Sequence, residues 1–157
     1  MTEKRINAKY AVPESVMNGF TLVELLTVVI MVGILFYLGL PAYQNAILKS
    51  HRIVARGILA EVVSREAQYF INNKSYTNDL TDLGYLSDPF YVDDQADTFA
   101  SPGNTIYRID LELSGLVYFV TATPLNRQAR DSLCGTYSLT SKGVKSVSGS
   151  AGYAECW

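Results

Sequence analysis

Residues 19–41 have the sequence GFTLVELLTVVIMVGILFYLGLP, and the rest of the chain is organised around this apolar stretch. From Phe20 to Leu40 it carries a single charged side chain, that of Glu24. A helix rises about 1.5 Å per residue, so about 20 residues cross a hydrocarbon layer of about 30 Å. The stretch therefore predicts one membrane-spanning helix at residues 20–41.

Glu24 is unusual in such a segment because a carboxylate in hydrocarbon costs about 3 kcal/mol and usually has a partner. Cleavage between Gly19 and Phe20 would create an α-amine one helical turn from Glu24. A generic single-pass anchor explains the apolar run but needs no Glu24. A secretory signal peptide has a shorter apolar core, of about 7 to 15 residues, and an A-x-A-like cleavage site. The charged residue favours an anchor that is processed.

The motif Gly-Phe-Thr-Leu-Val-Glu-Leu-Leu at residues 19–26, followed by Pro41-Ala42-Tyr43, resembles the class III signal of type IV pilins and related pseudopilins. The resemblance implies cleavage by a prepilin peptidase after Gly19 and N-methylation of Phe20. It also implies that Glu24 pairs with the amine of Phe20 on an adjoining pilin subunit.

The same resemblance makes residues 1–19 a cleaved leader, with Met1 or Met17 as the start of translation. The precursor would span the bacterial inner membrane once. An assembly platform in that membrane would then extract the subunit into a cell-surface pilus.

The rest of the chain, residues 42–157, is long enough for one globular head, which would be periplasmic before assembly. The formal net charge of −2 argues against bulk attraction of the protein to nucleic acid or to an anionic membrane surface. Any contact with such partners would therefore depend on a local cluster of charges.

Two cysteines, Cys134 and Cys156, lie near the C-terminal end. Without a C-x-x-C motif or a Cys/His cluster, zinc binding and thiol catalysis have no support. A disulfide is the simplest assignment and requires an oxidising compartment, while two free thiols in a cytosolic head are the alternative. The run at residues 130–140 and the terminal Cys156-Trp157 look particularly like PilE-type minor pilins, in which a disulfide bounds the C-terminal region.

Residues 42–73 predict the amphipathic second half of the helix, ending near residues 72–74. Its apolar stripe comprises Ala55, Leu59, Val63, Ala67 and Phe70, with Ile58 and Val62 beside it, and Glu66 is expected on another face. Pro41 predicts a kink or a local break because it cannot donate a backbone hydrogen bond.

Residues 74–104 predict a long Asp-rich loop, which the pilin resemblance makes the αβ-loop, a region of subunit contact. Asp93, Asp94 and Asp97 could in principle hold Ca²⁺, but no EF-hand spacing is present. A solvated acidic loop is favoured, and no metal or other cofactor is predicted.

From residue 105 the apolar period becomes two. One hairpin is predicted from residues 105–113 and 116–123, and a second from residues 136–140 and 144–147. Four antiparallel strands packed on a helical stripe make an α+β fold. This is also the type IV pilin fold, with sheet and disulfide region at residues 105–157.

Catalysis has no support, because no nucleophile motif or phosphate-binding loop is present and the single histidine, His51, has no acid partner nearby in sequence. His51 is expected to be solvated. The predicted function is a minor structural subunit of a type IV pilus, supporting assembly, adhesion, twitching motility or DNA uptake. A type II secretion pseudopilin is an alternative, against which the C-terminal disulfide counts.

A second alternative is a DNA-binding competence pilin. Its candidate residues are four cations after Pro124, namely Arg127, Arg130, Lys142 and Lys145. Their charge could instead attract the acidic loop of a neighbouring subunit. Four dispersed cations without interleaved aromatic residues are a weak footprint for DNA.

Overall fold

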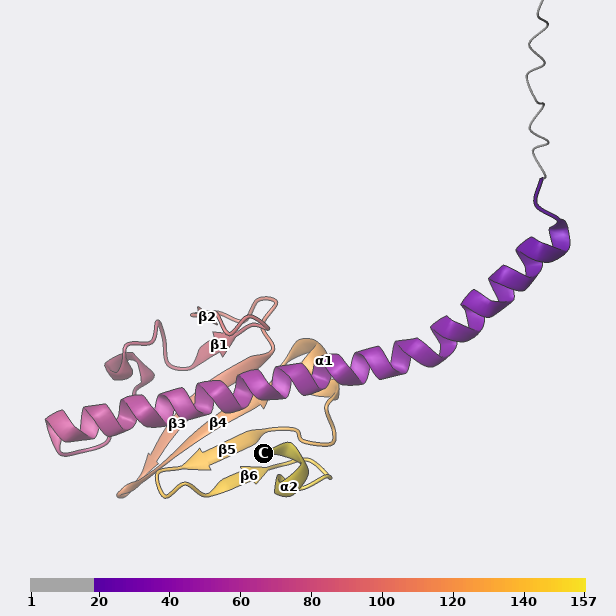
Figure 1. Cartoon of the computed structure of the whole chain (residues 1–157). Coiled ribbons are helices and arrows are strands. Elements are labelled where there is room, and N and C mark those ends of the chain that lie inside the picture. The colour runs from indigo at the N-terminus through magenta and orange to yellow at the C-terminus, as the bar shows by residue number, and fades with distance from the viewer. Residues whose placement is uncertain (1–18) are drawn as a thin grey trace, which may run out of the picture. The chain divides into compact units, whose positions relative to one another are not determined.

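The computed structural model describes residues 19–157. The predicted leader therefore lies outside the described residues apart from Gly19, and so do both candidate start positions. The elements, shown in Figure 1, are α1 Leu22–Asn73, η1 Leu80–Leu83, β1 Phe90–Val92, β2 Thr98–Phe99, β3 Tyr107–Ser114, β4 Val117–Pro124, η2 Asn126–Arg130, β5 Tyr137–Thr140, β6 Lys145–Val147 and α2 Tyr153–Cys156.

Contacts divide the chain into two compact units between Leu40 and Pro41. α1 contributes to both units and is continuous through Pro41, so there is no local break, and the predicted kink stays a prediction. The predicted end of the helix is confirmed, because α1 ends at Asn73. Lys74 follows with φ of +59°, the left-handed conformation that commonly ends a helix.

The head, from Pro41 onward, contains one antiparallel sheet in the order β2-β1-β3-β4-β5-β6. β3 and β4 are the longest pair, in register from Tyr107 opposite Pro124 to Ser114 opposite Val117. Gly115, with φ of +64°, begins the two-residue turn between them. The predicted first hairpin is thus confirmed, and β5 with β6 form the second.

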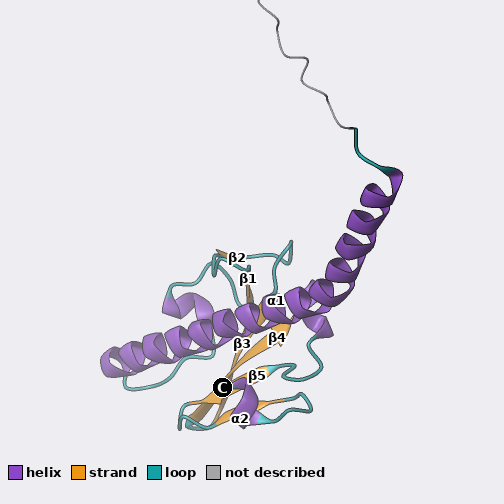
Figure 2. Cartoon of the chain, turned by 45° about the vertical axis from the view of Figure 1, so that its right-hand side comes forward, coloured by secondary structure: helices purple, strands orange, loops and turns teal. Residues whose placement is uncertain are grey.

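The core lies between the second half of α1 and one face of the sheet (Figure 2). Alternate residues of the strands are buried against the helix, as expected of a sheet with one wet face. The largest fully buried apolar side chains are Leu59 from α1, Leu80 from η1, and Phe90, Tyr107, Ile109 and Tyr137 from the strands. The α+β pilin architecture and its C-terminal disulfide are therefore confirmed.

The sheet has six strands where four were predicted, because β1 and β2 arise from the stretch predicted to be a loop. β1 has only three residues, of which Phe90 and Val92 are fully buried. Three residues are too few to show a period of two. β1 is a strand because it pairs with the edge of β3, a contact remote in sequence.

The buried stripe of α1 also differs from the prediction. Ala67 and Phe70 are exposed, while Glu66 has no accessible surface. The buried side chains recur at Ile58, Leu59, Val62 and Glu66, which follows a 3.6-residue period rather than steps of four. The face that covers the sheet thus includes a carboxyl group at its C-terminal end.

Candidate functional site

The predicted processing site lies just before α1. Gly19 and Phe20 are exposed and non-helical, and α1 begins at Leu22. Thr21 Oγ1 accepts a hydrogen bond from the backbone N–H of Glu24 at 3.2 Å. Thr21 is therefore the N-cap residue, and Glu24 occupies the third helical position, as in a capping box. The T-x-x-E spacing at residues 21–24 is the sequence signal of this cap.

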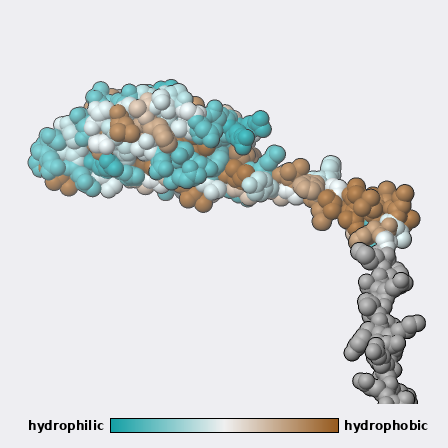
Figure 3. All heavy atoms as spheres, turned by 90° about the horizontal axis from the view of Figure 1, so that it is seen from above, coloured by the Kyte–Doolittle hydropathy of each residue, from teal (hydrophilic) through white to brown (hydrophobic). Residues whose placement is uncertain are grey.

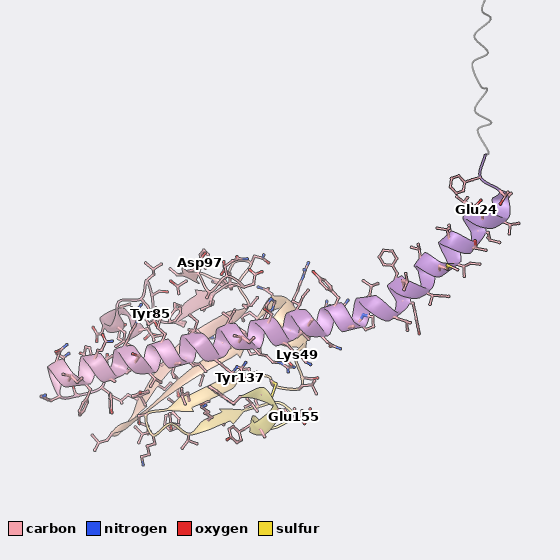
Figure 4. The ribbon with its side chains drawn as sticks, viewed as in Figure 1. Glu24, Lys49, Tyr85, Asp97, Tyr137 and Glu155 are labelled. Atoms are coloured by element: carbon pink, nitrogen blue, oxygen red, sulfur yellow. A yellow bond between two sulfur atoms is a disulfide. The ribbon has the colours of Figure 1, made fainter. Side chains whose placement is uncertain are left out.

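Glu24 stands at the very start of the helix (Figure 4), where the aligned backbone dipoles favour a negative charge. An amine formed at Phe20 would be placed directly before the cap. The geometry therefore places Gly19 and Phe20 directly before the first turn of α1, which carries Glu24.

The first half of α1 is long and apolar enough to cross a membrane, and none of its most apolar window is buried within the described chain. Apolar residues cover its surface in Figure 3. Ile30, Leu35 and Phe36 are each more than half exposed. Such a surface requires lipid or other apolar helices around it.

At the other end of the chain, Cys134 and Cys156 form a disulfide, 22 residues apart in sequence. Both residues are buried. The bond closes a segment that contains β5, β6 and α2. The predicted pairing is confirmed. The closed segment joins the sheet through β5, which pairs with β4.

A buried ion pair lies beside the disulfide. Arg52 of α1 donates from Nε and Nη2 to the two carboxylate oxygens of Asp131, each at 2.7 Å. Asp131 also accepts a hydrogen bond from the backbone N–H of Cys134 at 3.3 Å. The Asp131 carboxylate raises the pKa of the Arg52 guanidinium by hydrogen bonding. The pair ties α1 to the start of the disulfide-closed segment.

Gln128 of η2 extends this network. Its amide nitrogen donates to the hydroxyl of Tyr107 at 3.0 Å, and its Oε1 lies 2.8 Å from His51 Nδ1. Because the Gln128 oxygen can only accept, His51 donates from Nδ1. His51 is therefore hydrogen-bonded within the head, and the prediction that it is solvated is wrong. Its partner lies 77 residues away, so the residues near His51 in sequence give no sign of it.

The structure separates the four predicted DNA-binding cations into two groups. Arg127 and Arg130 are exposed on η2, which follows the end of β4. Lys142 and Lys145 belong to the β5–β6 hairpin, whose turn lies near the start of β4, since Thr140 pairs with Phe119. The two groups therefore flank the sheet rather than form one patch.

These four cations differ from several others in the described chain because they form no ion pair there. The ion pairs found within residues 19–157 use Arg52, Arg65 and Arg108. The four candidate residues enter none of those pairs, so their charges remain available to an outside anion. An aromatic partner is also present, because Lys145 Nζ lies 5.0 Å from the ring centroid of Trp157.

The acidic loop between β1 and β2 is built as a turn. Asp93 Oδ1 accepts hydrogen bonds from the backbone N–H groups of Gln95 and Asp97, at 3.0 and 2.9 Å. Over the part of the chain that the structure describes, no three metal-ligating side chains converge. The local geometry thus uses Asp93 to hold the backbone of the loop.

Comparisons with known proteins agree with this architecture. Residues 41–138, more than half of the chain, match the family model described as "Type IV minor pilin ComP, DNA uptake sequence receptor". Among curated proteins, a type IV major pilin protein PilE1 of Neisseria gonorrhoeae is 35% identical over 74 residues, which are 46% of this chain and 44% of that protein. A PilE of the same organism is 36% identical over 72 residues, or 45% of this chain and 42% of that protein.

The matched segments therefore span less than half the length of these curated relatives. The family model, in contrast, covers the second half of α1, strands β1 to β4 and the first disulfide cysteine. Together with the apolar N-terminal helix and the disulfide, this match shows that the chain belongs to the family of type IV minor pilins.

Proposed function

We propose that this minor pilin is a DNA receptor for uptake, displayed on a type IV pilus and held there by its apolar N-terminal helix. The observation that carries the proposal is the match of residues 41–138 to a family described as a DNA uptake sequence receptor. Proteins of this family are structural and non-enzymatic, so the function depends on binding surfaces.

Assembly would begin with cleavage after Gly19. The exposed, non-helical backbone at Gly19 and Phe20 supports this step, because a peptidase needs an extended and accessible substrate. The new amine of Phe20 would then meet Glu24 of an adjoining subunit within lipid, where each charge removes the other's cost of desolvation. Prepilin peptidase, other pilin subunits and the assembly platform are the partners that this step requires.

DNA binding would use the exposed cations outside the ion pairs of the head. The chain as a whole is negative, so attraction for phosphate must come from a local group. Arg127 and Arg130 lie three residues apart on η2, just after the end of β4, and both are exposed to solvent. Guanidinium groups suit this role because they bind phosphate with two parallel hydrogen bonds.

The test is a salt titration of a labelled DNA duplex with the full chain in a neutral maltoside detergent. The affinity of the wild-type protein should fall with salt, by about 0.9 in logarithmic slope for each phosphate contact. Arg127→Ala/Arg130→Ala should weaken binding at every salt concentration and reduce that slope by about 2. The control Lys74→Ala/Arg108→Ala removes the same charge elsewhere and should bind like wild type.

Two results would count against the proposal. An affinity that does not change with salt would exclude binding led by phosphate. Equal weakening in both double variants would show that only net charge matters, which is not the behaviour of a receptor with a defined surface.

A role restricted to pilus assembly, motility or adhesion is the second candidate. The apolar surface of the first half of α1 favours it, since this surface needs partners in the filament whether or not the head binds DNA. Deletion of the gene distinguishes the two roles. A DNA receptor is expected to leave piliation intact and abolish DNA uptake.

A further inference from the structure

A groove of about 400 Å³ lies between α1 and the β6 side of the sheet. Gly57 and Ala60 of α1 and Leu139 of β5 contribute apolar surface to it. Arg56 and Lys145 also line it, together with Trp157. The groove thus combines an aromatic ring, two cations and apolar walls.

Trp157 is held in a fixed orientation. Its indole Nε1 donates to the backbone carbonyl of Ser146 at 3.2 Å, and Tyr137 contacts the ring edge-on, with centroids 5.5 Å apart. The residue is nevertheless partly exposed. A rigid, partly exposed indole can stack on a ligand with little loss of side-chain entropy on binding, because the fold already holds it in place.

The charged side chains that line the groove are all cationic. Lys145 Nζ lies 5.0 Å from the Trp157 ring centroid, whereas Arg56 Nη1 is already engaged, because it donates to the main-chain oxygen of Trp157 at 2.8 Å. No acidic side chain lines this groove within residues 19–157. Lys142, in the turn before β6, is a second exposed cation on the same hairpin as Lys145.

We propose that this groove binds one unpaired nucleobase of the DNA, stacked on Trp157, with the flanking phosphates on Lys145 and Lys142. The inference rests on the proposed function and adds the class of ligand, an unstacked or single-stranded nucleotide. Base stacking on aromatic side chains with cations along the backbone is the usual combination in single-strand binding. The ammonium of Lys145 would leave the ring face for a phosphate, which its flexible stem allows.

The size of the groove supports a single nucleotide. Its volume is near the lower end of pockets for small ligands, so a duplex cannot enter it. Its apolar walls can contact the faces of a base, and its cations can bind a phosphate.

Gly57 provides a direct way to close the groove. A Cβ added at this position meets no atom within 4 Å, and the residue is helical. Gly57→Leu therefore places its Cβ without a clash and extends a side chain from the wall of the groove, and it improves helix propensity, so the variant should fold. Ala67→Leu adds similar bulk at an exposed position of α1 that does not line the groove.

Trp157 is the only tryptophan of the chain, so its fluorescence reports on this groove alone. The experiment titrates the full chain in neutral maltoside detergent with a single-stranded oligonucleotide and with a matched duplex. It records Trp157 fluorescence together with the anisotropy of labelled DNA. We expect single-stranded DNA to quench Trp157, and Gly57→Leu to abolish the quenching and weaken single-strand binding about tenfold. Ala67→Leu should behave like wild type.

The outcomes separate this inference from the proposed function. DNA that binds by anisotropy without changing Trp157 fluorescence would overturn the groove and leave the receptor proposal standing. Wild-type affinity in Gly57→Leu would do the same. A protein that binds neither form of DNA at low salt would overturn both.

Discussion

The ion pair between Arg52 and Asp131 should be a major source of stability for the head. Asp131→Asn keeps the shape of the side chain and removes its charge. In the folded protein Asp131 is 1% exposed and Arg52 is 12% exposed at the side chain. The substitution therefore leaves a guanidinium in a poorly hydrated site without its counter-charge, and it removes one of the two hydrogen bonds of 2.7 Å, because the amide nitrogen of Asn cannot accept one.

Removing one partner of a buried ion pair costs about 3 to 5 kcal/mol. Because Arg52 keeps some access to water, we expect the lower value, about 3 kcal/mol, for Asp131→Asn. This is a large part of the 5 to 15 kcal/mol that roughly spans the stability of small domains. For a head of this size the loss corresponds to a fall in Tm of about 10 °C.

The assay is thermal and urea unfolding of the full chain in detergent, followed by circular dichroism. Arg52→Met and the double variant Arg52→Met/Asp131→Asn complete a double-mutant cycle. The expected coupling energy is about 2 kcal/mol. The double variant should recover only part of the stability, because Gln128 Nε2 and the N–H of Cys134 also donate to Asp131.

Arg108→Ala is the control, since it breaks the more exposed pair with Asp110 and should change the free energy of unfolding by at most about 1 kcal/mol. If Asp131→Asn costs as little as this control, or if the coupling energy is near zero, the argument from burial is wrong.

Three further predictions follow from the core, the disulfide and the processing site. Cys134→Ser/Cys156→Ser should lower the free energy of unfolding by about 3 kcal/mol in urea titrations, because the disulfide constrains the unfolded chain, whereas an unchanged urea midpoint would refute this. Burial raises the pKa of Glu66 to about 6, so the folded protein binds more protons than the unfolded chain. The contribution of Glu66 to the free energy of unfolding should therefore be largest below about pH 4.5. It should fall by roughly 2 kcal/mol as the pH rises through 6. Glu66→Gln should flatten that dependence in unfolding titrations at pH 5 and pH 7.5, and a wild-type slope in the variant would contradict the assignment. Glu24→Ala should still be cleaved after Gly19, as mass spectrometry can show, but should be depleted from sheared pili, and normal incorporation would argue against charge pairing.

Much of the fold can be derived from local sequence. The apolar run at residues 20–41, the end of α1 at Asn73 and the β3–β4 hairpin depend on hydrophobic period and turn residues, which act over short distances. The two cysteines likewise had one simple pairing. These features identify the pilin architecture before any tertiary contact is known.

The polar interior could not be derived in this way. Glu66 was expected away from the apolar stripe, yet it is buried and accepts a hydrogen bond from the backbone N–H of Thr77. His51 was expected to be solvated, yet it contacts Gln128, 77 residues away. The same holds for Arg52, whose partner Asp131 is 79 residues away. A charged side chain inside a periodic helix carries no local sign of what will cover it.

Sequence by itself thus determined the apolar run, the helix, the strands of the hairpins and the disulfide, since each depends on residues that are neighbours in the chain or on a single possible pair. Tertiary structure alone decided the extra strands β1 and β2, the split of the cations into two groups, and the groove beside Trp157. The physical reason is that strand edges, buried ion pairs and grooves are made by the approach of segments far apart in sequence, and their energies exist only after the chain has folded.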